Sequence, residues 1–220
     1  MSKNKYIIIA LDGAAGSGKS TTAKAVCQKF KYIHVDTGLH YRSLCLYFLN
    51  KNISADKVCD YLSCNSISMN SVIDDFSVYL SLDGHHFSSE QLRNQEMNKN
   101  VSYYARLPEL RNLLLNYQRD LCAYGQKSGF SGIIMDGRDI GSVVLPDADL
   151  KFFLHADLSI RQQRRSSDGE TDSISGRDKL DSTRKTAPLV CPADAISINT
   201  GLHTIDHVVD LFSQHILSLG

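Results

Sequence analysis

The sequence has no excess of charge of either sign. Lysine and arginine total 24, as do aspartate and glutamate, so the formal net charge is zero. Proteins that bind nucleic acid over a broad surface carry a basic field, so this class of function is not indicated and any basic site has to be local. Hydrophobic residues make up 42% and charged residues 22%, which is typical of a globular domain.

The chain also shows no apolar run near its N-terminus that could cross a membrane. The run from Tyr6 to Leu11 has six residues, whereas a bilayer requires about 20. Asp12 and a glycine-rich stretch follow this run in place of the small-residue cleavage site of a signal peptide. We therefore expect no membrane association and a cytoplasmic location.

No pair of cysteines has the C-x-x-C spacing. The six cysteines stand at positions 27, 45, 59, 64, 122 and 191, and several lie inside apolar runs. Their spacing supports neither a disulfide framework nor a zinc site. We expect them to be buried, reduced thiols.

Short apolar segments alternate with helical patterns along most of the chain. Strands are predicted at residues 6–11, 32–35, 133–135, 150–154 and 195–198, and helices at 19–30, about 39–49, 108–121, 158–165 and 205–217. Such an alternation is typical of a parallel sheet with right-handed crossovers and helices on its faces. The predicted fold class is therefore α/β, in one domain.

The middle of the chain departs from this alternation. Residues 76–82 alternate between polar and apolar, and Asp83-Gly84 and residues 85–87 follow. This pattern predicts a β-hairpin within a small antiparallel insert at about 63–90. The polar stretch from 166 to 175 predicts a mobile loop.

A phosphate-binding motif follows the first predicted strand. The segment Gly13-Ala14-Ala15-Gly16-Ser17-Gly18-Lys19-Ser20 matches G-x-x-x-x-G-K-[ST], with Thr21 next to it. A strand before and a helix after the motif are the context that it requires. We expect these residues to bind the triphosphate of ATP, with Lys19 on the outer phosphates and the Ser20 hydroxyl on Mg²⁺. Asp12 is expected to hold the shape of the loop by accepting backbone hydrogen bonds.

Two other classes of phosphate-loop protein lack their marker here. A GTPase should carry N-K-x-D, and neither candidate segment has the aspartate: Asn50-Lys51-Asn52-Ile53 and Asn98-Lys99-Asn100-Val101. The L-S-G-G-Q segment of transporter ATPases is also missing from the sequence. A kinase for a small molecule is the class that remains.

Arginines stand where an anionic acceptor would bind. Two unit charges 4 Å apart repel by about 4 kcal/mol at an effective dielectric of 20, and arginine offsets this by binding phosphate through two parallel N–H groups. Arg42 and Arg138 closely follow predicted strands, at the sheet edge where such folds bind ligands. Arg161, Arg164 and Arg165 share one turn of a predicted helix.

Taken together, the motifs resemble those of the bacterial cytidylate kinases, which phosphorylate CMP and dCMP with ATP. The resemblance covers essentially the whole chain. Besides the phosphate loop and the central insert, it rests on four blocks in the same order: Asp36-Thr37-Gly-x-x-Tyr41-Arg42, Asp136-Gly137-Arg138-Asp139-Ile140-Gly141, Arg177-Asp178-x-x-Asp181-x-x-Arg184-x-x-x-Pro188-Leu189 and Ala193-Asp194-Ala195.

The resemblance implies roles for the matching residues. The acceptor phosphate would be held by Thr37, Tyr41, Arg42 and Arg138. The cytosine edge would be read by Ser102, Arg111 and Asp139, and the ribose contacted by Arg177 and Asp181. Arg161, Arg164 and Arg184 would neutralise the migrating phosphate, in an in-line transfer with no covalent enzyme intermediate and no dedicated strong base.

The resemblance also implies an organisation of the chain. Residues 1–220 would form a single kinase domain with a nucleoside monophosphate-binding (NMP-binding) region at about 38–111 and a lid at about 161–185, acting as a monomer. The lid segment between Arg165 and Arg177 is shorter than is usual in the family, which puts its closure over the site in question. Asn199 stands where the family commonly has aspartate.

Some alternatives stay open at this point. Asp36 could position Mg²⁺ through water or cap the following turn. The acceptor could be UMP or AMP in place of CMP, and a non-catalytic nucleotide-sensing module is a third possibility. The last is disfavoured because Lys19 and the lid arginines are present.

Overall fold

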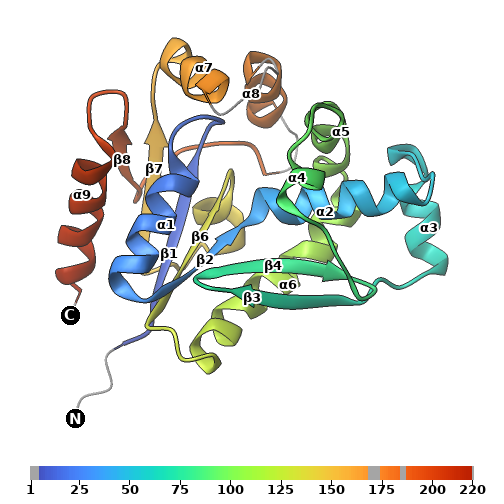
Figure 1. The fold of residues 1–220 in the computed structure, drawn as a ribbon, viewed down its shortest axis with the longest axis horizontal. Helices are drawn as coiled ribbons and strands as arrows, with labels where there is room; N and C mark the ends of the chain where they lie inside the picture. The colour runs from blue at the N-terminus through green and yellow to red at the C-terminus, as the bar shows by residue number, and fades with distance from the viewer. Residues whose placement is uncertain (1–4, 168–173, 184–186, 220) are drawn as a thin grey trace.

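The computed structural model describes residues 5–167, 174–183 and 187–219. In these ranges one sheet of eight strands has the order β3-β4-β2-β6-β1-β7-β8, and β5 pairs with β4 (Figure 1). The strands are β1 (Ile7–Gly13), β2 (Tyr32–Asp36), β3 (Met69–Asp74), β4 (Ser77–Leu82), β5 (His85–His86), β6 (Gly132–Gly137), β7 (Leu150–His155) and β8 (Ile196–Asn199). The run β2-β6-β1-β7-β8 is parallel throughout, which confirms the predicted α/β class.

Helices cover both faces of this parallel sheet. α1 (Lys19–Phe30) and α9 (Ile205–Leu217) pack on one face, where Phe152 of β7 stacks on Phe212 of α9 with ring centroids 3.7 Å apart. α6 (Pro108–Lys127) packs on the other face, where its Leu121 joins Ile33 and Met135 in a second core cluster. Strands buried on both faces explain the continuous apolar runs in the sequence.

A third apolar cluster lies in the region predicted to bind the nucleoside monophosphate. It joins α2 (Thr37–Asn50), α3 (Val58–Cys64), β4, α5 (Gln95–Ala105) and the first half of α6. Phe48 of α2 and Leu82 of β4 are fully buried in it. This cluster supports the helices that carry the predicted acceptor-binding residues.

The insert is a continuation of the main sheet. The predicted hairpin is present as β4 and β5, which pair antiparallel. β3, which the sequence did not predict, pairs with the other edge of β4. The backbone N–H of His34 donates to the carbonyl of Phe76 at 2.6 Å and so ties the insert to the edge of β2.

Two helices follow the hairpin, and both have clear N-terminal caps. α4 (Ser89–Leu92) starts with a capping box formed by Ser88 and Gln91. At the start of α5, the Asn94 side chain accepts a hydrogen bond from the backbone N–H of Met97 at 2.8 Å.

Two other expectations need correction. The prediction of a loop at 166–175 is wrong at both of its ends, because α7 (Leu158–Ser167) and α8 (Ile174–Ser182) include residues of this range. Ile174, the first residue of α8, is buried. Residues 168–173 of that loop lie outside the described residues. All six cysteines are free, but Cys59, Cys64 and Cys191 are exposed, so the expectation of buried thiols is wrong for these three.

Over the ranges that the structure covers, no helix combines enough length with enough apolar character to cross a bilayer.

Candidate active site

The phosphate loop lies between β1 and α1, at the carboxyl end of the sheet. Gly16 and Gly18 have φ angles of 73° and 86°, a left-handed backbone that favours glycine. A Cβ on Gly16 would also lie 2.7 Å from the carbonyl oxygen of Arg161. Among the described residues, no side chain caps the start of α1. The first N–H groups of this helix are therefore available to bind an anion.

Asp12 supports a neighbouring segment and not the phosphate loop itself. Its two carboxylate oxygens accept the backbone N–H groups of Ile140 and Gly141, each at 2.7 Å. Burial raises the pKa of Asp12 to about 6, although these two hydrogen bonds act in the opposite direction. The expected backbone bonds exist, but they fix the chain directly after Asp139.

Lys19 is buried among the groups that the motif predicts around it. Its Nζ donates to the carbonyl of Ala14 at 3.0 Å. Burial, together with the nearby charge of Arg138, lowers the pKa of Lys19 to about 7, and Asp136 opposes this shift. A phosphate next to Nζ would favour the charged form of the lysine, so the site is suited to an anion.

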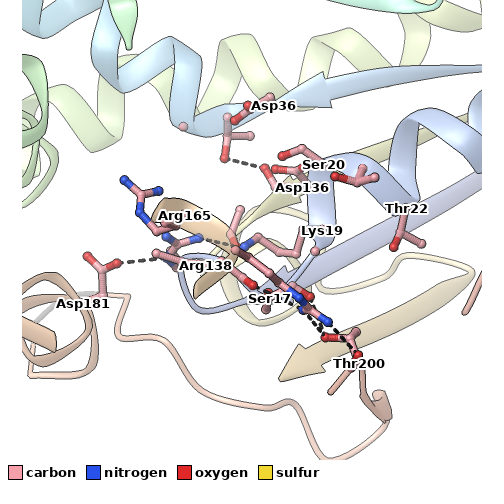
Figure 2. Close-up of a pocket in the computed structure, with 18 of the residues that line it drawn as sticks. Ser17, Lys19, Ser20, Thr22, Asp36, Asp136, Arg138, Arg165, Asp181 and Thr200 are labelled. Atoms are coloured by element: carbon pink, nitrogen blue, oxygen red, sulfur yellow. Dashed lines mark hydrogen bonds and ion pairs between the residues drawn. The ribbon is translucent and has the colours of Figure 1, made fainter. Parts of the chain in front are cut away.

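Ser20 lies beside a carboxylate that the sequence reasoning did not assign. Asp136, at the end of β6, is 2% exposed, and His34 Nε2 lies 2.9 Å from its Oδ2. Burial raises the pKa of Asp136, but hydrogen bonds from His34 and Ser20 and the charge of Lys19 outweigh it and hold this pKa below its ordinary value. Figure 2 shows Ser20 next to Asp136, with Lys19 close by.

A hydroxyl and an ionised carboxylate are the hard oxygen donors that Mg²⁺ prefers. Phosphate-loop enzymes hold the ion with this pair of residue types, so Ser20 and Asp136 fit it. A signal for Asp136 was present in the sequence, since Ile133-Ile134-Met135-Asp136 is an apolar strand that ends in aspartate at the ligand-binding edge of the sheet.

Asp36 caps a helix in this structure. Its Oδ1 accepts the backbone N–H of Leu39 at 3.3 Å, at the start of α2. Its Oδ2 accepts a hydrogen bond from Arg93 Nη2 at 3.0 Å. Of the two interpretations offered for Asp36, capping is thus observed. Next to it, the Thr37 hydroxyl donates to the carbonyl of Asp136 at 2.8 Å.

Two of the predicted phosphate-binding arginines are held firmly by the protein. Arg42 is buried and donates to the carbonyl of Leu92 and to Asn98 Oδ1, both at 2.7 Å. Arg138 donates from Nε to Asp181 Oδ2 and from Nη1 to the carbonyl of Gly13, both at 2.9 Å. Arg138 therefore bridges the phosphate loop and α8, and Figure 2 shows its bond to Asp181.

The residues predicted to read the base form a buried cluster. Arg111 of α6 and Asp139 are 8% and 4% exposed, and Arg111 Nη2 makes an ion pair with Asp139 Oδ2. Arg111 also donates to the carbonyl of Ala105 at 3.2 Å and lies 5.6 Å from the ring centroid of Tyr41. Ser102 of α5 lines the same cavity as Asp139. Arg111 therefore contacts both Asp139 and Tyr41, and these two residues line one cavity with Ser102.

The arginines of α7 that were predicted to belong to a lid contact the phosphate loop. Arg161 Nη1 donates to the carbonyl of Ala15 at 3.1 Å and to Asp178 Oδ2 at 2.5 Å. Arg164 Nη1 donates to the Thr200 hydroxyl at 2.9 Å. Two further predicted residues cannot be placed in this way: Arg177 lies on α8 but its side chain is outside the described residues, and Arg184 lies outside them altogether.

One cavity of about 710 Å³ connects these groups. The phosphate loop and the start of α1, from Ala15 to Thr22, line this cavity, and so do Ser102 and Asp139, two of the residues predicted to read the base. Arg111 and Arg161 stand behind this lining, in contact with Asp139 and Ala15.

Some of the residues that line the cavity had no role predicted from the sequence. Thr200, His203 and Ile205, which follow β8, line it together with Arg164. Asn199 Oδ1 accepts the backbone N–H of Gly201 at 3.0 Å and so shapes this turn.

Comparison with known proteins agrees with this geometry. A family model described as cytidylate kinase matches residues 9–218. The cytidylate kinase of Clostridium tetani is 40% identical, over 96% of this chain and 94% of its own, and that of Limosilactobacillus fermentum is 38% identical over 96% of both. A gluconokinase structure from Sinorhizobium meliloti, 12% identical, aligns with a TM-score of 0.50 over 100% of this chain and 95% of its own, which shows a shared fold alone. The chain therefore belongs to the cytidylate kinase family.

Proposed function

We propose that the protein transfers the terminal phosphate of ATP to CMP or dCMP and so produces CDP or dCDP and ADP. Membership of the cytidylate kinase family supports this function. The single observation that carries the choice of base is the buried Arg111–Asp139 ion pair, next to Ser102 in the cavity that the phosphate loop also lines.

Cytosine complements this cluster. Its edge offers an amine donor at N4 and acceptors at N3 and O2, which a carboxylate and an arginine can satisfy together. Uracil has a carbonyl at position 4, which would face the carboxylate of Asp139. A buried polar mismatch of this kind discriminates strongly, by up to about 10⁴–10⁵-fold, because it leaves polar groups unpaired.

The acceptor phosphate and sugar would bind between the base cluster and the phosphate loop. In this proposal Thr37, Tyr41, Arg42 and Arg138 hold the phosphate, and Arg177 and Asp181 contact the ribose. The hydrogen bonds that already fix Arg42 and Arg138 support this, because they reduce the side-chain entropy lost when phosphate binds.

The donor would bind along residues 13–21, whose backbone N–H groups and Lys19 face the triphosphate. Ser20 and Asp136 would hold Mg²⁺ with the ATP. The ion supplies charge stabilisation to the phosphate oxygens when it is bound.

Positioning and charge neutralisation would carry most of the catalysis. The acceptor is itself an anionic phosphate, so the site needs no strong base and no covalent intermediate on the protein. Lys19, Arg138, Arg161, Arg164 and Arg184 would neutralise the charge that shifts between the two nucleotides. Preorganised donors in a closed site are effective because they need no rearrangement at the moment of transfer.

The proposed organisation is a single domain over residues 1–220, with an NMP-binding region at about 38–111, its insert at about 63–90, and a lid at about 161–185. Asp181 of α8 makes an ion pair with Arg138, which follows β6, and Asp178 of α8 makes one with Arg161 of α7. The first pair joins the proposed lid to the core and the second joins its two helices, which supports a lid that closes on the phosphates. Its monomeric state and its cytoplasmic location stay predictions.

ADP production from ATP and Mg²⁺ tests the proposal, with CMP, dCMP, UMP, AMP and no acceptor run in parallel. Selective turnover of CMP and dCMP is the expected result. Equal turnover of UMP or AMP would keep the kinase class and contradict the base assignment. Nucleotide binding without turnover of any acceptor would favour a sensing module.

A further inference from the structure

We propose that His34 is a positioning residue for the metal-binding carboxylate of Asp136. This inference rests on the proposed function only in requiring that Mg²⁺ and ATP bind at the phosphate loop. His34 lies on β2, the strand next to β6, and its backbone pairs in register with Ile134. Side chains two residues apart point to the same face of a sheet, so the register places His34 and Asp136 on one face.

The contact between the two side chains is buried and directional. His34 Nε2 lies 2.9 Å from Asp136 Oδ2, and the side chains are 2% and 3% exposed. An aspartate carboxylate offers acceptor oxygens, whereas a ring N–H of histidine is a donor. Nε2 is therefore the donor in this hydrogen bond.

The bond fixes the orientation of the carboxylate. A free aspartate can rotate about its last side-chain bond, but a donor that holds Oδ2 on the β2 side restricts this rotation. The carboxylate is then kept in position to accept the hydrogen bond from Ser20 on α1. Partners of this kind behind metal ligands commonly change metal affinity by about 10–100-fold when they are removed.

The backbone of His34 has a separate structural role. Its N–H bonds the carbonyl of Phe76 at 2.6 Å and ties the insert to the sheet whatever the side chain. His34 also lines a second cavity of about 270 Å³, together with Lys24, Gln28 and Tyr79 among others.

The test measures the affinity for a fluorescent ATP analogue with Mg²⁺ and with EDTA. The ratio of the two dissociation constants gives the enhancement of binding by the metal. His34→Leu is expected to reduce this ratio by about tenfold or more while affinity in EDTA stays unchanged. His34→Gln keeps an N–H donor and is expected to retain more of the enhancement. His40→Leu is the matched control at another buried histidine and should keep the wild-type ratio.

A double-mutant cycle separates positioning from a general structural effect. If His34 acts through Asp136, His34→Leu should have no further effect on the ratio in an Asp136→Asn background. A wild-type ratio in His34→Leu would overturn the inference, and so would an equal loss in both backgrounds. A wild-type protein that does not bind the analogue, or binds it without any enhancement by Mg²⁺, would overturn the proposed function as well.

Discussion

The burial of His40 leads us to predict that the stability of the protein depends on pH in an unusual way. The His40 side chain is fully buried on α2, with its ring 5.4 Å from that of Tyr117 in an edge-on contact. Within the described residues, neither ring nitrogen has a hydrogen-bond partner. Burial lowers the pKa of His40 from 6.5 to about 3, so the folded protein holds this ring in its neutral form.

The sign and size of the effect follow from proton linkage. Between about pH 3 and 6.5 the unfolded chain binds a proton at this position and the folded chain does not, so the free energy of unfolding falls as the pH falls. Each pH unit below 6.5 lowers the free energy of unfolding by about 1.4 kcal/mol. At pH 5 the loss from His40 is therefore about 2 kcal/mol, and near pH 7.5 it is close to zero.

His40→Leu isolates this contribution. Asp12 and Lys19 also have shifted pKa values, to about 6 and about 7, but both variants share them and they cancel in the difference. Leucine also removes two unpaired buried nitrogens, each of which costs about 1–3 kcal/mol. The substituted protein should be more stable at both pH values, and its advantage should grow by about 2 kcal/mol on going from pH 7.5 to pH 5.

Urea unfolding followed by far-UV circular dichroism measures both free energies. The sequence has no tryptophan, so tyrosine fluorescence is the second probe. An advantage of His40→Leu that is the same at both pH values would refute the reasoning, because it would mean that the ring takes up a proton in the folded state as easily as in the unfolded chain.

Three further predictions concern activity. Lys19→Ala should lower kcat by at least about 10²–10³-fold with an unchanged melting temperature; retained turnover would contradict the role of the phosphate loop. Asp139→Ala should reduce the preference for CMP over UMP by about 10²-fold or more, measured as the ratio of the two kcat/KM values, with little change in the KM for ATP; an unchanged ratio would remove Asp139 from the base-reading role. Arg138→Lys should lower kcat/KM for CMP by about 10–100-fold, because lysine cannot bridge Asp181, Gly13 and a phosphate together. Wild-type kinetics in this variant would contradict the prediction.

Local sequence patterns were sufficient to predict a structural feature when a single continuous segment of the chain forms it. The phosphate loop is such a case, because its glycines, lysine and serine are neighbours in sequence and the backbone itself forms the site. α1 was predicted with its observed bounds of Lys19–Phe30. The caps of α4 and α5 show that more could have been predicted, since Ser88 and Asn94 are recognisable N-cap residues followed by short helices.

The sequence by itself therefore determined the fold class, the phosphate loop and, through ordered motifs, the family. The tertiary structure decided which of the distant groups meet. His34 and Asp136 are 102 residues apart, and Arg111 and Asp139 are 28 apart. Their contacts depend on strand register and on the packing of α6 against the sheet, which no local pattern specifies. Burial then sets the chemistry of these groups, because the loss of water changes how strongly a charge interacts with its neighbours.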